Sequence, residues 1–223
     1  IDEDRSPFAS IYTSLGCIFK CEFCMINIIN RTDNDPEKAS SSFNKFRYWN
    51  PEFTIKQLDY LAAQGVKQIK VADEMWVLKP KHFLNLCDLI IERDYGFNMW
   101  AYTRVDTVKP KYLEKLKAAG VNWLALGIEA GNTEIRREIT KGKFEETNIR
   151  EVVGMIQDAG INVCANYIFG LGHDTYDTMQ ETLNLALELN AEYSNMYCAT
   201  SLPGSPLYLK AKKLARIDCS SGF

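Results

Sequence analysis

The residues best suited to chemistry are three cysteines, Cys17, Cys21 and Cys24, which lie within eight positions at the spacing C-x3-C-x2-C. Three thiolates from one short loop can hold an iron-sulfur cluster that normally takes four protein ligands, which leaves one iron open to another molecule. An open coordination position is typical of a catalytic centre. The spacing therefore predicts that these three cysteines are the metal ligands of such a cluster.

Two other interpretations of the cysteines are weaker. A zinc site is normally closed by a fourth Cys or His at a second paired spacing, and the sequence contains no further C-x2-C or H-x3-H pair. Disulfides are disfavoured because the seven cysteines are an odd number and no secretory signal is visible. A noncatalytic iron-sulfur or zinc-binding module remains the alternative function.

Composition limits the class of protein. With 223 residues, of which 46% are hydrophobic and 25% charged, the chain suits a single domain, 1–223, with no second domain within it. A net charge of -3 does not indicate a nucleic-acid partner, and the sequence has no apolar run long enough to span a membrane. We expect a cytoplasmic protein. Because the chain begins at Ile1 without methionine, we also expect it to be a fragment of a longer protein.

A recurring helix-strand unit predicts the fold. Glycine or asparagine suited to the left-handed end of a helix recurs along the chain, at spacings that fit βα units of about 30 residues. These positions are Gly65, Gly96, Gly120, Gly160 and Asn190. Strands are expected near 8–13, 67–73, 97–103, 121–128, 162–169 and 192–198. Six such units favour an α/β fold, a partial (β/α)6 TIM-type barrel.

Local signals predict where individual helices begin. Thr54 and Gln57 form a capping box for a helix over 54–64, and Pro110 suits the first position of another helix. Asp174 is expected to cap a helix whose buried stripe includes Tyr176 and Leu187. The stretch 30–50 is expected to be a loop with a short helix that packs over the cysteine loop.

Polar residues gather where the strands should end. In parallel α/β barrels the working groups lie at the carboxyl ends of the strands, because the loops there form the open mouth. Asp73 and Glu74 follow the second strand, Arg104 the third and Glu129 the fourth. Each could instead be an ordinary loop charge, for example Arg104 paired with Asp106, but their shared position favours one common site.

The cysteine motif, with Phe23 directly before its third cysteine, closely resembles the signature of the radical S-adenosylmethionine (SAM) superfamily. The resemblance covers roughly residues 8–208, and the core of that family is a (β/α)6 fold. It implies a [4Fe-4S] cluster whose open iron binds SAM, and reductive cleavage of SAM to a 5′-deoxyadenosyl radical that abstracts hydrogen from a small-molecule substrate. It also implies an external one-electron reductant such as flavodoxin or ferredoxin.

The same resemblance assigns roles to the residues of the rim. Asp73 or Glu74 would bind the methionyl ammonium of SAM, Arg104 its carboxylate, and Glu129 its ribose or methionyl part. Gly170 would allow close approach of the adenine, and Phe23 would pack against the adenine ring. Asn166 either faces the barrel interior, where it contacts SAM, or is a satisfied core amide.

Three segments, 73–76, 127–131 and 169–172, look most like those of superfamily members that carry a cobalamin-binding domain. The resemblance thus implies methyl transfer or cyclisation, with cobalamin bound by a domain outside this chain. The remaining cysteines and the two histidines are not assigned to the site. We expect Cys87, Cys164 and Cys198 in the core, Cys219 without a partner, and His82 and His173 at the surface or at helix caps.

Overall fold

A six-stranded parallel sheet forms the centre of the computed structural model, which describes residues 7–140 and 148–214. The strands follow the order β1-β4-β5-β6-β7-β8 without interruption, and each neighbouring pair is parallel. Their bounds are β1 (Phe8–Ile11), β4 (Gln68–Val71), β5 (Asn98–Arg104), β6 (Val121–Glu129), β7 (Asn162–Phe169) and β8 (Tyr193–Cys198). The sheet confirms the predicted α/β partial barrel, and all six predicted strands are present within a few residues.

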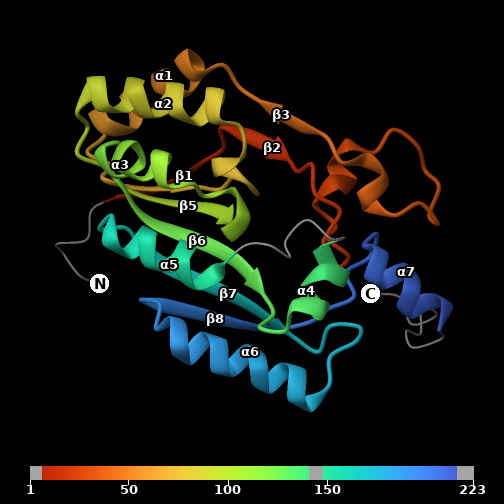
Figure 1. The fold of residues 1–223 in the computed structure, drawn as a ribbon. Coiled ribbons are helices and arrows are strands. Elements are labelled where there is room, and N and C mark those ends of the chain that lie inside the picture. Colours follow the sequence, from red (N-terminus) through yellow and green to blue (C-terminus); the bar gives the residue numbers. More distant parts are fainter. Residues whose placement is uncertain (1–6, 141–147, 215–223) are drawn as a thin grey trace.

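Helices cover one face of this sheet (Figure 1). The covering helices are α1 (Pro51–Ala63), α2 (Pro80–Arg93), α3 (Pro110–Ala118), α5 (Ile149–Asp158) and α6 (Tyr176–Leu189). Two further helices, α4 (Thr133–Thr140) and α7 (Pro206–Lys213), lie at the carboxyl ends of the strands (Figure 1). Alternate strand residues such as Ile69, Met99 and Leu124 point to the helices and are at most 1% exposed. The other alternate positions, including Trp100 and Tyr102, lie on the inner face.

The observed helix starts correct two expectations. Helix α1 begins at Pro51 because the side chain of Asn50 accepts a hydrogen bond from the Glu52 amide, so the predicted capping box at Thr54 is wrong. Helix α6 is capped by Thr175 rather than Asp174. Its expected buried stripe is also wrong at Tyr176 and Leu187, since these side chains are 77% and 70% exposed.

The helix ends follow the predicted pattern. Gly65, Gly120 and Gly160 all have a positive φ, and Asn190 ends α6 in the left-handed conformation. Helix α2 ends slightly earlier than expected, because Asp94 adopts the left-handed conformation two residues before Gly96.

The segment between the cysteines and α1 contains a strand that was not expected. After two short 3-10 helices, η1 (Ile26–Asn30) and η2 (Ser40–Phe43), strand β3 (Phe46–Tyr48) pairs antiparallel with β2 (Ser14–Gly16). At the end of β2, Gly16 has a φ of +86°, and any Cβ there would overlap the carbonyl of Lys45. This small sheet leads the chain directly into the cysteine loop.

The remaining cysteines and histidines differ in how deeply they are buried. Cys87 and Cys164 are fully buried, as expected, whereas Cys198 is exposed on β8 and was wrongly placed in the core. His82 is 4% exposed, so its expected surface position is wrong. His173 is exposed and lies 2.7 Å from Glu138. Cys219 falls outside the described residues.

Within residues 7–140 and 148–214, no helix combines the length and the apolar character that crossing a membrane requires.

Candidate functional site

The cysteine loop leaves β2 at Gly16 and lies at the carboxyl end of the parallel sheet. Cys17 is 8% exposed, while Cys21 and Cys24 are partly buried. The Phe19 amide lies 3.4 Å from Cys17 Sγ, and the Cys24 amide donates to the Cys21 carbonyl over 3.2 Å. The loop is therefore folded back on itself, so the three thiols share one small region.

One buried amide side chain that the sequence analysis missed holds this loop. Asn27 Oδ1 accepts from the Cys17 amide at 3.1 Å, and its Nδ2 donates to the Phe19 carbonyl at 3.3 Å. Asn27 is 4% exposed. Its position three residues beyond Cys24 is the only signal in the sequence, and it follows no general pattern.

The two carboxylates after β4 have different partners. Asp73 is completely buried, and its Oδ1 accepts from the Thr13 amide at 2.6 Å. Its Oδ2 accepts from the hydroxyls of Thr13 at 2.6 Å and Ser14 at 2.5 Å. Both oxygens of Asp73 are thus taken up by the segment that precedes the cysteine loop.

Glu74 is only partly buried, and its Oε2 accepts from the Gly16 amide at 3.0 Å. Burial raises the pKa of Glu74 above its ordinary value, although hydrogen bonds from its own backbone and from Gly16 oppose that shift. Glu74 therefore lies beside Gly16, the residue before Cys17, and its second carboxylate oxygen takes no part in the hydrogen bond to Gly16.

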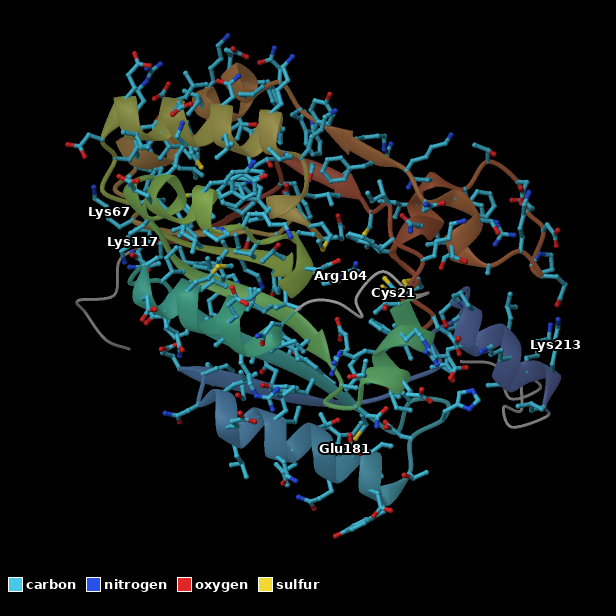
Figure 2. The ribbon with its side chains drawn as sticks, viewed as in Figure 1. Cys21, Lys67, Arg104, Lys117, Glu181 and Lys213 are labelled. Carbon is cyan, nitrogen blue, oxygen red and sulfur yellow. The ribbon has the colours of Figure 1, made fainter. Side chains whose placement is uncertain are left out.

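Arg104 lies against the cysteine loop from the end of β5. Its Nε and Nη2 bond Asp106 in a bidentate pair at 2.6 and 2.5 Å, while Nη1 is 3.8 Å from Cys21 Sγ. The guanidinium also stacks 3.5 Å from the centre of the Phe19 ring. Figure 2 shows Arg104 and Cys21 near each other. The pairing with Asp106 considered from the sequence is present, and it aims the guanidinium at the cysteines.

Glu129 ends β6 in an unusual backbone conformation. Its φ is +70°, a region that non-glycine residues rarely adopt, and the pairing of β6 with β7 shifts register there. A Cβ on Gly127 would lie 2.5 Å from Glu129 Oε1, so Gly127 makes room for this carboxylate. Burial raises the pKa of Glu129 to about 7, and the nearby charge of Arg104 only partly offsets the shift.

Asn166 and Gly170 come from β7 and the turn after it. Asn166 Nδ2 donates to the carbonyls of Leu126 and Cys164, and its Oδ1 accepts from Asn195 at 3.0 Å, so the amide links three strands. The amide of Gly170 donates to Asp174 Oδ2 at 2.9 Å. Asp174 thus shapes the Gly170 turn instead of capping α6.

Phe23 and helix α7 complete the rim. Phe23 packs on a small apolar cluster formed by Ala130, Ile135, Ile139 and Leu171, which joins the cysteine loop to the ends of β6 and β7. The neighbouring Glu22 accepts a hydrogen bond from Lys210 at 2.8 Å, although these residues are 188 positions apart.

The donor set fits an iron-sulfur cluster. Burial raises the pKa of Cys17 to about 11 and that of Cys21 to about 12, so without metal these thiols keep their protons. Among the described residues, no three Cys, His, Asp or Glu side chains meet closely enough to bind a single metal ion. A cubane does not need that convergence, because each cysteine binds a different iron, and Arg104 supplies positive charge beside the thiolates.

Comparison with known proteins agrees with this site. Residues 11–186 match the sequence pattern of the radical SAM superfamily, and the chain belongs to that superfamily. The chain is 27% identical over 207 residues to an uncharacterized methyltransferase from Pyrococcus horikoshii, covering 92% of this chain and 42% of that protein. It is also 26% identical over 196 residues to the anaerobic magnesium-protoporphyrin IX monomethyl ester cyclase of Rubrivivax gelatinosus, covering 86% and 33%.

A solved structure has the same fold. The radical SAM methyltransferase TsrM from Kitasatospora setae, with cobalamin and a [4Fe-4S] cluster bound, superposes with a TM-score of 0.80 at 20% identity. The match covers 97% of this chain and 42% of TsrM. The chain therefore spans less than half the length of each of these three proteins.

Proposed function

We propose that this chain is the catalytic core of a radical SAM enzyme, with Cys17, Cys21 and Cys24 as ligands of a [4Fe-4S] cluster. One observation carries the proposal: side chains from the ends of three different strands, Glu74, Arg104 and Glu129, surround the loop that holds these cysteines. A noncatalytic metal module would have no need for charged groups at that position.

A [4Fe-4S] cluster held by Cys17, Cys21 and Cys24 would supply one electron for reductive cleavage of a carbon-sulfur bond of SAM, with methionine and a 5′-deoxyadenosyl radical as the products. The chain itself binds SAM, orients it and excludes water. Arg104 would hold the methionyl carboxylate through the end of its guanidinium that carries Nη1, because Nε and Nη2 are bonded to Asp106 and Nη1 faces Cys21. Glu74 rather than Asp73 takes the ammonium, because Asp73 already accepts three hydrogen bonds.

The remaining residues hold the other end of SAM. Glu129 binds the ribose hydroxyls or the methionyl part, and its left-handed backbone turns the carboxylate toward the cysteine loop. The exposed Gly170 turn and Phe23 flank the adenine. Asn166 keeps the inner ends of β6, β7 and β8 in register beneath SAM.

The inner face of the sheet suits a flat, conjugated substrate. Trp100 and Trp123 stack with ring centres 5.4 Å apart, and Lys70 lies 5.1 Å over the ring of Tyr102. These residues, with Phe8, line a groove of about 370 Å³ toward the amino-terminal ends of the strands, since Phe8, Gln68 and Asn98 begin β1, β4 and β5. A bound substrate would extend from this groove along the inner face toward the cysteine loop. Relatives include a tryptophan 2-C-methyltransferase and a bacteriochlorophyllide d methyltransferase, so methyl transfer to, or cyclisation of, a planar small molecule fits best.

The whole protein would also use partners outside the described residues. Cobalamin would bind to a domain outside this chain, as implied by TsrM, whose structure contains it. A one-electron reductant such as flavodoxin or ferredoxin would supply the electron. Both the buried free thiols and the cluster suit the reducing cytoplasm.

Anaerobic reconstitution with iron and sulfide, followed by reduction and addition of SAM, tests the proposal. We expect 5′-deoxyadenosine by chromatography, and its loss when Cys17, Cys21 or Cys24 is replaced by alanine. Cys87→Ala is the matched control, because Cys87 lies on the buried side of α2, outside the cysteine loop, and its replacement should leave cleavage intact. Cleavage that persists in all three loop variants, or a bound metal that proves to be zinc, would exclude the proposed enzyme.

A further inference from the structure

An exposed cleft lies on the outer side of the cysteine loop, away from the groove on the inner face of the main sheet. It has a volume of about 460 Å³ and is bounded by Ile18, the β3 segment and the residues before α2. Figure 1 shows β2 and β3 outside the six-stranded sheet. We call the surface formed by Ile18, Lys45, Arg47, Tyr48, Lys79 and Lys81 the β3 face.

The β3 face is basic although the chain as a whole is acidic. Asp and Glu make up 29 of the 223 residues, yet none of the residues that line the cleft is acidic. The lining includes the cations Lys45, Arg47 and Lys79. The wall of the cleft therefore presents positive charge to solvent.

The centre of the β3 face is apolar and exposed. Ile18 is 44% exposed and Tyr48 is 48% exposed. Lys79 Nζ lies 2.6 Å from the Tyr48 hydroxyl and 3.9 Å from the centre of its ring, so the lysine and the tyrosine form one unit. An apolar centre with a charged rim is the usual composition of a protein docking surface.

The β3 face is continuous with the backbone of the cluster ligands. Ile18 directly follows Cys17, and its carbonyl accepts a hydrogen bond from Asn44 Nδ2 at 2.7 Å. In the small sheet, Arg47 is paired with Leu15 and Phe46 with Gly16, the residue before Cys17. A molecule in this cleft would thus be separated from a cluster ligand by a single residue.

We propose that the β3 face is the docking surface for a small acidic electron-carrier protein that reduces the cluster. This inference rests on the proposed function. The carrier would give up one electron and be oxidised by one step, and the cluster would be reduced by one step, with no bond formed or broken. Opposite charges would speed the encounter, and the small apolar centre suits the brief, low-area contacts of electron-transfer partners.

A nucleic acid is the rival partner for a basic surface, but the β3 face suits it less well. Its positive groups surround an aliphatic and aromatic centre instead of forming a stripe. The β3 face also contacts the loop that contains Cys17. Binding there would bring an electron donor close to the cluster, whereas a nucleic acid would gain nothing from that position.

Binding to the cluster-free protein tests docking independently of catalysis. We expect flavodoxin, an acidic carrier, to bind the apoprotein with an affinity that falls as salt is raised, and cytochrome c, a basic carrier, not to bind. Lys45→Glu/Arg47→Glu should weaken flavodoxin binding about tenfold or more, because rim charges are reversed. Neither side chain has a described partner whose loss would unfold the protein.

The matched control is Lys67→Glu/Lys117→Glu, which carries the same change in net charge. Figure 2 shows both lysines at the end of the molecule opposite Cys21, so flavodoxin binding should stay within about twofold of the unchanged protein. Thermal unfolding of both variants checks that each is folded. Equal weakening by the two variants, or binding of a single-stranded RNA at the β3 face in place of flavodoxin, would overturn the proposal.

A second experiment measures the rate at which the cluster is reduced. In reconstituted protein, the Lys45→Glu/Arg47→Glu variant should be reduced more slowly by flavodoxin, measured by stopped-flow absorbance, yet at the unchanged rate by dithionite. An unchanged rate with flavodoxin contradicts the docking surface. Failure to cleave SAM even with dithionite contradicts the proposed function instead, so the two failures are distinguishable.

Discussion

The ends of β4 and β6 both present a carboxylate to the cysteine loop, but they differ in how the protein completes them. At β4, Asp73 is buried and saturated by Thr13 and Ser14. At β6, Glu129 sits in a strained backbone conformation, and no hydrogen bond from the described residues reaches its carboxylate. Folding alone completes the hydrogen bonds of Asp73, whereas we propose that the carboxylate of Glu129 finds its partner in SAM.

This contrast predicts that mutation of Asp73 damages stability and that mutation of Glu129 damages SAM binding. The largest effect is expected for Asp73→Ala, which leaves the buried amide and hydroxyl of Thr13 without their acceptor. The free energy of unfolding should fall by about 3 kcal/mol. Denaturant unfolding measures the loss, with Glu74→Ala as the comparison at less than about 1 kcal/mol. Equal losses in the two variants would remove the distinction between these carboxylates.

Glu129→Gln is expected to change the pH dependence of stability. The carboxyl has a pKa of about 7 when folded and 4.5 ordinarily, so between these values the folded state binds more protons than the unfolded state. The stability of the cluster-free protein should therefore fall as the pH rises through this range and level off above it. Thermal unfolding across the range should show a flatter profile for Glu129→Gln; an unchanged slope would mean that Glu129 is not responsible.

Gly127→Ala sharpens the comparison because it disturbs Glu129 without altering any charge. The added methyl would meet Glu129 Oε1 and displace the carboxylate, so SAM affinity should fall about tenfold. Gly154→Ala is the control, since a Cβ there meets nothing within 4 Å and should slightly stabilise α5. In a Glu129→Ala background Gly127→Ala should have little further effect on affinity; additive losses would refute the link.

The smallest effect is expected for Asn27→Ala, which loses the hydrogen bonds to Cys17 and Phe19. Stability should fall by about 1 kcal/mol, because the buried amide of Cys17 loses its acceptor. Iron release from reconstituted protein, followed with a chelator, should be faster than in an Asn30→Ala control, whose side chain bonds Lys45 instead. Equal release rates would show that Asn27 does not hold the loop.

The sequence predicted the strands and the cysteine ligand loop well, because both depend on local patterns of apolar residues, glycines and spacing. It could not show which of Asp73 and Glu74 is buried and which is open to a ligand. The two side chains face different sides of the strand end, and only Asp73 meets the hydroxyl groups of Thr13 and Ser14. Competing helix caps were misjudged for a similar reason: Asn50 followed by Pro51 was the stronger signal, and Thr54 is instead buried.

Long-range contacts were beyond any pattern of spacing. The role of Asn27 depends on where a turn places its amide, and the strand β3 exists only because β2 lies beside it. The position of Cys198 shows the same limit. The sequence of β8 does not indicate that the described helices leave the side of the strand on which Cys198 lies exposed to solvent.

The hydrogen bonds that join Glu22 to Leu207 and Lys210 have a consequence for how the enzyme is made. The cysteines leave the ribosome before α7 does, because Glu22 and Lys210 lie 188 positions apart in the sequence. A growing polypeptide that already carries all three thiols still lacks the hydrogen bonds from Leu207 and Lys210 to Glu22. Iron and sulfide are therefore best delivered after synthesis of α7, and truncation before Leu207 should leave a loop that takes up metal but does not retain it.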